Sequence, residues 1–122
     1  MALTVSGFSS ANLTYKLAYD DNISATSPGT DVFGSSGTIH GISITNSESS
    51  NTAYLKMKIT SGTVTVGTTQ PDLMFQVTAG KSTQIDFPAG LKFTQLSYWV
   101  TVNAVHTDTT DPGTIVASFL CS

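Results

Sequence analysis

The chain contains no arginine, and only 11% of its 122 residues are charged. Its five cations are all lysines, set against eight acidic residues, so the formal net charge is −3. A protein that binds nucleic acid displaces counterions with a basic face and reads bases with arginine side chains. An anionic membrane surface attracts the same kind of basic face. The composition therefore argues against both nucleic acid and membranes as partners.

Cysteine, glutamate and histidine are also scarce, with one, one and two residues respectively. Cys121 is the only cysteine, so no disulfide can form within the chain, and its place in an apolar run predicts a buried side chain. Glu48 is the only glutamate, which leaves no obvious pair of carboxylates for glycoside hydrolysis. The sequence also lacks a GxSxG elbow and a phosphate-binding glycine loop. We therefore expect no enzymatic activity, no catalytic residue and no cofactor.

One loop, HTDTTDPG, gathers the residue types that metals favour. It begins at His106 and contains Asp108 and Asp111. Its spacing lacks the alternating Asp or Asn positions and the distal Glu of a calcium loop. We interpret the two aspartates as bonding their own backbone in Asx turns, and we expect no metal site.

Export and membrane insertion leave no signature in the sequence. Residues 1–11 lack both the basic and the continuous apolar segments of a signal peptide. The longest apolar runs are much shorter than a bilayer requires. We therefore expect neither an export signal nor a membrane span.

What the chain does contain is a series of short alternating segments separated by Gly, Pro, Asn and Ser turns. No segment shows a helical period of adequate length. The pattern predicts an all-β, single-domain antiparallel β-sandwich of about eight strands, either jelly-roll or immunoglobulin-like. Residues 1–11 are expected to form an arm or edge strand, and residues 12–122 the sandwich. The predicted strands span residues 12–19, 39–45, 52–60, 63–66, 72–77, 82–87, 96–104 and 114–121. Pro88 should end the sixth of these strands, with a short continuation at residues 91–93.

Alternation also predicts which side chains share a face. The strand at residues 12–19 should be half-buried, with one apolar face, and should end at an exposed pair, Asp20 and Asp21. That apolar face consists of Leu13, Tyr15, Leu17 and Tyr19.

The strand at residues 52–60 should bury its apolar side chains and expose Lys56 and Lys58. Adjacent residues on a strand face opposite sides, so one of Tyr98 and Trp99 should lie in the core and the other outside. An outward ring could anchor a partner protein, or it could form part of a platform for a sugar.

Residues 20–37 form a long polar segment with a single bulky apolar pair, Val32 and Phe33. Segments of this length are often functional. Two interpretations stay open: the pair anchors the segment to its own core, or it docks onto a partner.

The second half of the chain resembles a small class of tailed-phage proteins. The resemblance rests on YLKMKITSGTVTVGTTQPDLMFQVTAG, IDFPAGLKF and HTDTTDPG, which match the class patterns YLKLY…TVGT…P, FPxGLxF and DTDTT. Members are encoded near virion genes and are taken for capsid decoration, neck or fibre proteins. The chain departs from the class at LSYWVTVNAV, where members have a glycine-rich strand. The resemblance implies no catalytic residue.

The resemblance implies a non-enzymatic virion structural protein on the capsid exterior. The function expected first is that of a capsid decoration (cement) protein, which binds across neighbouring major capsid subunits and stabilises the head. The alternatives are a neck, tail or fibre component, or a glycan-binding host-recognition module. The expected partners are the major capsid protein or other virion proteins, and further copies of the chain, for example in a trimer. The candidate contact residues are Leu3, Val5, Phe8, Val32, Phe33, Asp108 and Asp111.

Overall fold

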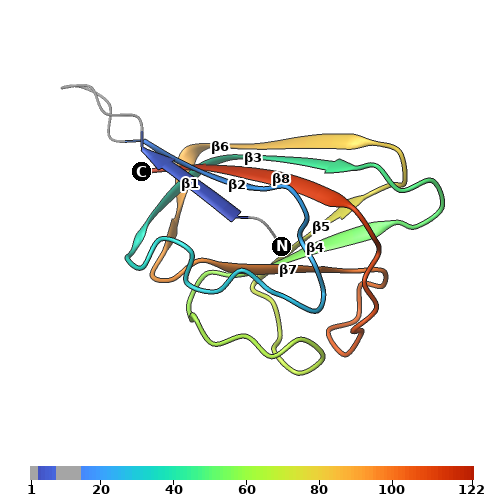
Figure 1. The fold of residues 1–122 in the computed structure, drawn as a ribbon. Helices are drawn as coiled ribbons and strands as arrows, with labels where there is room; N and C mark the ends of the chain where they lie inside the picture. The colour runs from blue at the N-terminus through green and yellow to red at the C-terminus, as the bar shows by residue number, and fades with distance from the viewer. Residues whose placement is uncertain (1–2, 8–14) are drawn as a thin grey trace.

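The computed structural model describes residues 3–7 and 15–122, and these form eight strands and no helix (Figure 1). The strands are β1 (Leu3–Gly7), β2 (Lys16–Asp20), β3 (Gly37–Asn46), β4 (Ala53–Lys58), β5 (Leu73–Val77), β6 (Ser82–Phe93), β7 (Ser97–Thr101) and β8 (Ile115–Cys121). All strand pairs are antiparallel. The predicted all-β class is therefore confirmed.

The strands form two layers, a five-stranded sheet ordered β1-β2-β8-β3-β6 and a three-stranded sheet ordered β5-β4-β7 (Figure 1). The pairs are nested along the chain: β4 pairs with β5, β3 with β6, and β2 with β8. A further pair lies between β3–β6 and β2–β8 in this nested order. In it, Gly29, from the segment between β2 and β3, forms an isolated bridge to Tyr98 of β7. Such nested winding is that of a jelly roll rather than of an immunoglobulin fold.

Gly29 is what allows the segment between β2 and β3 to act as a fourth strand beside β7. Its N–H donates to the carbonyl of Tyr98 at 2.9 Å, and the N–H of Tyr98 donates to the carbonyl of Gly29 at 2.8 Å. A Cβ at position 29 would lie 2.6 Å from Cζ of Tyr98, so a larger residue would collide with that ring.

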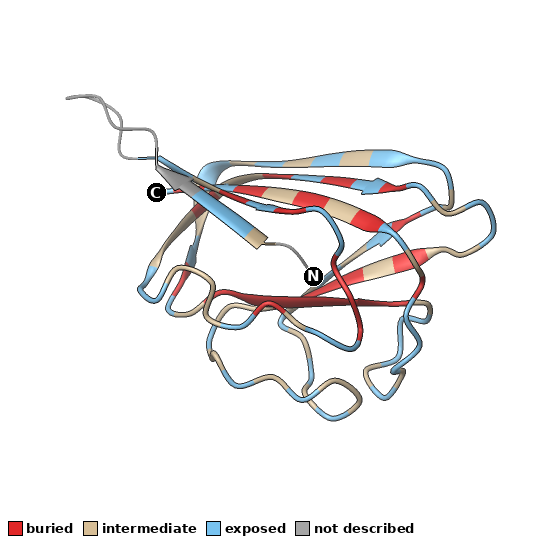
Figure 2. Cartoon of the chain, in the orientation of Figure 1, coloured by how far each residue is buried: buried red, intermediate tan, exposed pale blue. Residues whose placement is uncertain are grey.

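The core lies between the two sheets, where buried and more exposed residues alternate along several strands (Figure 2). The inward positions predicted for the apolar side chains of β3 and β4 are confirmed, and so is the burial of Cys121. Each fully buried aliphatic or phenylalanine side chain contributes about 1.5–3 kcal/mol relative to an exposed one. The larger core members include Ile39, Ile42, Ile44, Leu55, Met57, Leu96, Tyr98, Ile115 and Phe119.

The apolar residues of β2 suggested that their face points inward. In the structure, the other face of β2 points inward. Ala18 and Asp20 are fully buried, whereas Tyr19 is 43% exposed. The prediction that Asp20 is exposed is therefore wrong, although Asp21 is indeed exposed. Asp20 is tolerated in the core because its carboxylate accepts hydrogen bonds from the Tyr98 hydroxyl at 2.8 Å and the Asn22 N–H at 3.1 Å.

Lys56 and Trp99 correct two further predictions, because both are fully buried. They lie in register on the outer side of the three-stranded sheet, which the loops after β4 and β7 cover (Figure 1). The Lys56 ammonium donates to the carbonyl of Val105 at 2.7 Å. Burial lowers the pKa of Lys56, and the nearby charge of Asp108 opposes that shift. Tyr98 is also buried, so neither member of the Tyr98–Trp99 pair lies outside.

Two predicted strand boundaries also differ from the structure. Residues 63–66 are not a strand: residues 63–65 are irregular and a turn follows at residues 66–68, closed by the N–H groups of Thr68 and Thr69, which donate to the carbonyl of Thr65. Pro88 does not end its strand: β6 continues to Phe93 across a bulge, where its register with β3 jumps from Gly41↔Asp86 to Ile39↔Leu91. A bulge tolerates proline because its residues are left out of the ladder.

Candidate functional site

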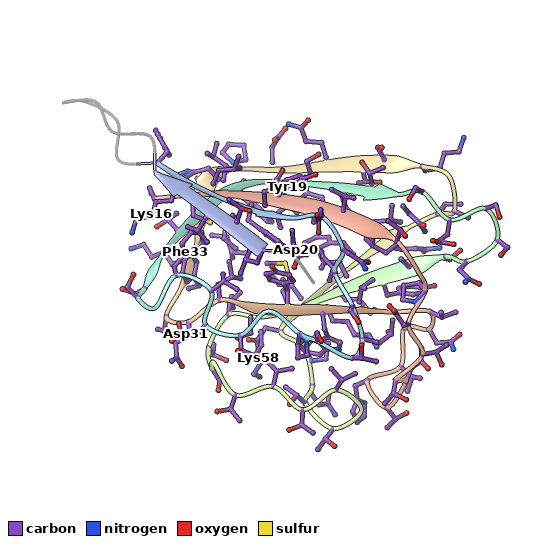
Figure 3. The ribbon with its side chains drawn as sticks, in the orientation of Figure 1. Lys16, Tyr19, Asp20, Asp31, Phe33 and Lys58 are labelled. Carbon is purple, nitrogen blue, oxygen red and sulfur yellow. The ribbon has the colours of Figure 1, made fainter. Side chains whose placement is uncertain are left out.

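The outer face of the five-stranded sheet is the face turned away from the three-stranded sheet, and it carries exposed apolar side chains beside a hollow. Figure 3 shows Tyr19 at this face and Asp20, the next residue, directed between the sheets. Strand register places side chains of four strands side by side on it. One row consists of Leu17, Leu120, Gly41 and Asp86, and the next of Tyr19, Ser118, Ser43 and Gln84.

An apolar stripe runs along the β2 side of this face. We define it as Tyr15, Leu17, Tyr19 and Leu120. Tyr15 is 38%, Tyr19 43% and Leu120 36% exposed, and Leu17 is half-buried opposite Leu120. Single exposed apolar residues are ordinary, but a contiguous group rimmed by polar residues marks an interaction site. The stripe is therefore the first candidate for contact with a partner.

A hollow of about 220 Å³ lies beside the stripe. Its floor is low because Gly41 has no side chain and Ser43 and Ser118 are small. Its remaining walls come chiefly from Leu17, Leu120, His40, Gln84 and Asp86.

The lining of the hollow contains both hydrogen-bond donors and hydrogen-bond acceptors, and it contains no lysine. The Gln84 amide donates to the Asp86 carboxylate at 3.1 Å, and the Tyr15 ring meets the His40 ring edge-on at 5.2 Å. Such a lining suits a neutral or cationic polar group better than an anion.

His40 also has a serine neighbour, with its Nε2 2.7 Å from Oγ of Ser122. A nucleophile and a base at this distance are one part of a hydrolytic site. Hydrolysis also requires a group that orients the other ring nitrogen and donors for the oxyanion. Across residues 3–7 and 15–122, no side chain is hydrogen-bonded to Nδ1 of His40.

The predicted contact residues that the structure describes lie outside this outer surface. Leu3, Val32 and Phe33 pack against the core, and the Phe33 ring stacks on Phe93 with centroids 6.0 Å apart. The structure thus shows the anchoring role for the Val32–Phe33 pair. Val5 is exposed on β1, and Phe8 falls outside the described residues.

Asp108 and Asp111 hold the loop between β7 and β8. The Asp108 carboxylate accepts from the N–H groups of Asn103 at 2.8 Å and Thr110 at 3.2 Å, the second bond being the predicted Asx turn. Partial burial raises the pKa of Asp108, but these bonds and the charge of Lys56 outweigh it, so the net shift is downward. Asp111 departs from the prediction, since its carboxylate accepts from the N–H of Ala25 at 3.4 Å instead of its own backbone.

The sequence contained one signal for the outer face, the alternation of residues 12–19. That alternation identifies an apolar face but not whether the face is turned inward or outward. The polar side of the hollow had no sequence signal, because His40, Gln84 and Asp86 come from two separate strands.

Neither a metal centre nor a membrane helix is found in the part of the chain that the structure describes. No three His, Cys, Asp or Glu side chains gather there to hold an ion. No helix there is long and apolar enough to cross a membrane. Comparisons with family models, curated proteins and solved structures found no match. The resemblance of the second half to tailed-phage proteins therefore stays a prediction.

Proposed function

We propose that this chain is a non-enzymatic structural protein of a tailed-phage virion, a decoration protein on the capsid exterior. It binds across neighbouring major capsid subunits and stabilises the head. The observation that supports this most is the apolar stripe, because Tyr15 just before β2 and Leu17 and Tyr19 on β2 lie on the outer face while Asp20 occupies the core. The resemblance of the second half of the chain supports the choice of partner.

The stripe and the hollow supply complementary parts of a protein interface. Burying the stripe contributes about 25 cal/mol per Å² of apolar area removed from water. Tyrosine rings provide large contact areas at low cost in side-chain entropy, as at the energetically dominant positions of many interfaces. The hollow would receive a polar side chain of the partner beside Gln84 and Asp86. Symmetric copies on a shell then act together and strengthen a modest single contact.

The proposal is tested on intact particles and on the isolated shell. Mass spectrometry of purified virions should detect the protein, and cryo-electron microscopy should place the apolar stripe against the shell. Recombinant protein added to shells that lack it should bind, and Tyr19→Ala should weaken binding at least about tenfold, or about 1.4 kcal/mol. Val105→Ala is the matched control, because Val105 is 54% exposed in a distant loop. Virions without the protein would overturn the proposal.

A second candidate, a glycan-binding host-recognition module, is favoured by the hollow. Asp86, Gln84 and His40 can bond hydroxyl groups, and the exposed rings of Tyr15 and Tyr19 stand nearby on the same face. A neutral saccharide presents hydroxyls of both hydrogen-bonding kinds and apolar ring faces. Trp99 cannot serve as the platform, since it is fully buried.

A glycan array separates the two candidates. Saturable binding to a neutral glycan that is lost in Gln84→Ala would favour the second candidate over the first. The control is Gln70→Ala, at an exposed position in the loop after β4. An array without saturable binding would eliminate the glycan-binding candidate.

A further inference from the structure

Strand β1 is an edge strand of the five-stranded sheet, and Leu3 at its start packs against the core. Among residues 3–7 and 15–122, it pairs with β2 alone. Val5 is in register with Ala18, so the two side chains share the core-facing side. Ala18 is fully buried, yet Val5 is 45% exposed. Val5 therefore points in the core direction at a place that the core does not reach.

In the part of the chain that the structure describes, the outer edge of β1 also lacks the usual protection against pairing. Natural edge strands are blunted by lysines, prolines or bulges. The sequence of β1, LTVSG, contains none of the charged or proline residues. The opposite edge of the same sheet, β6, carries Lys92, Pro88 and the bulge between Asp86 and Leu91. Of the two edges of this sheet, β1 is thus the one open to a further strand.

We propose that β1 pairs antiparallel with β1 of a second copy about a two-fold axis, joining two five-stranded sheets into one of ten strands. An antiparallel ladder is symmetric about such an axis, so one strand provides both halves of the contact. Pairing centred on Val5 brings the two Val5 side chains together and places Leu3 of each copy beside them. The apolar side chain that the core leaves uncovered is then covered by its own equivalent. The closed symmetry also stops growth at two copies, because each open edge is used once.

The dimer would also unite the two outer faces. The order across the axis becomes β2-β1-β1-β2, so the two apolar stripes lie three strand spacings apart, about 14 Å. Both stripes face the same side of one continuous sheet. The inference does not require the virion role, because self-association is measured on the purified protein alone.

The test is the oligomeric state of the full chain, by light scattering after size exclusion and by sedimentation at about 1–100 µM, where small interfaces associate. The wild type should be a dimer at the upper end of this range. Val5→Lys should be a monomer, since two like charges would meet at the axis. Val105→Lys, with the same charge change at an exposed loop valine, should remain a dimer. Circular dichroism and thermal unfolding verify that both variants are folded.

A second measurement gives a positive signal. Val5→Cys should form a disulfide-linked dimer under mild oxidation, whereas Val105→Cys should not. The native Cys121 is buried and does not compete. A wild type that stays monomeric throughout the range, or a dimer that Val5→Lys leaves intact, would overturn the inference.

Discussion

Asp20 and Tyr98 form a hydrogen-bonded pair inside the core, although 78 positions separate them in the chain. Burial, together with the charge and hydrogen bond of Asp20, raises the pKa of Tyr98, so the phenol keeps its proton and remains a donor. Their hydrogen bond joins β2, which lies next to the edge strand β1, to β7 of the three-stranded sheet. This buried contact lies on the inward face of β2, opposite the face that carries Tyr19.

Replacing Tyr98 with phenylalanine should lower the free energy of unfolding by about 1–3 kcal/mol, because the Asp20 carboxylate loses a buried partner. Urea denaturation measures this as a lower midpoint with an unchanged slope. Tyr19→Phe makes the same chemical change on the exposed face and should stay within about 0.5 kcal/mol of the wild type. Equal stability of the two variants would contradict the assigned role of the pair.

Cys121 should make the protein less stable in alkaline solution. Burial raises the pKa of its thiol from 9.0 to about 12. Above pH 9 the unfolded thiol ionises while the folded one keeps its proton, so this contribution is complete below pH 9 and lost as the pH rises toward 12. Between pH 9 and 11 the unfolding free energy of the wild type should fall more steeply than that of Cys121→Ala, by up to about 1.4 kcal/mol per pH unit. Parallel curves would show that the thiol is not shielded.

At the scale of elements, Asn46 ties three segments together at one end of the sandwich. Its buried side chain donates to the carbonyls of Asn51 at 2.8 Å and Val77 at 3.0 Å, and it accepts from the N–H of Glu48 at 3.0 Å. These bonds fix the turn between β3 and β4 and hold the end of β5 against it. Through these three hydrogen bonds, the Asn46 side chain links β3 of one sheet to β5 of the other.

Asn46→Ala should therefore destabilise the protein by at least about 2 kcal/mol, since buried partners are left unpaired. The loss is measured by chemical denaturation, and hydrogen exchange should rise at Glu48, whose N–H loses its acceptor. Asn103→Ala is the matched control, because Asn103 is exposed and only its backbone groups take part in the hydrogen bonds found there. If the two variants were equally stable, the role of the Asn46 side chain in linking β3 to β5 would be refuted.

The sequence predicted strands better than it predicted their surroundings. Alternation identified β3 and β4 and their inward residues, because local spacing alone decides which side chains share a face. It failed for Lys56 and Trp99, whose burial depends on loops that fold back over the sheet. It also failed for the orientation of β2, which depends on Tyr98. These outcomes rest on contacts between distant parts of the chain, and no local window contains them.

At the scale of the whole molecule, the nested winding makes β8 indispensable. Strand β8 lies between β2 and β3 and is their only connection within the five-stranded sheet. It also brings Ile115, Ala117 and Phe119 into the core. Strand β1, by contrast, contacts the rest of that sheet only through β2.

Removing residues 114–122 should therefore abolish cooperative unfolding and the strand signal in circular dichroism. Removing residues 1–7, which include the edge strand β1, should leave both in place with a lower melting temperature. The comparison is made by thermal scans of the two truncated chains. A folded chain without residues 114–122 would contradict the central position assigned to β8.

The central place of β8 also has a consequence for biosynthesis. Ribosomes deliver a chain from its N-terminus, so every other strand of this fold is made before β8. Leu120 of the apolar stripe and Ser118 of the hollow are both on β8. A growing chain therefore has no complete outer face, and a partner that recognises this face can select finished molecules over unfinished ones.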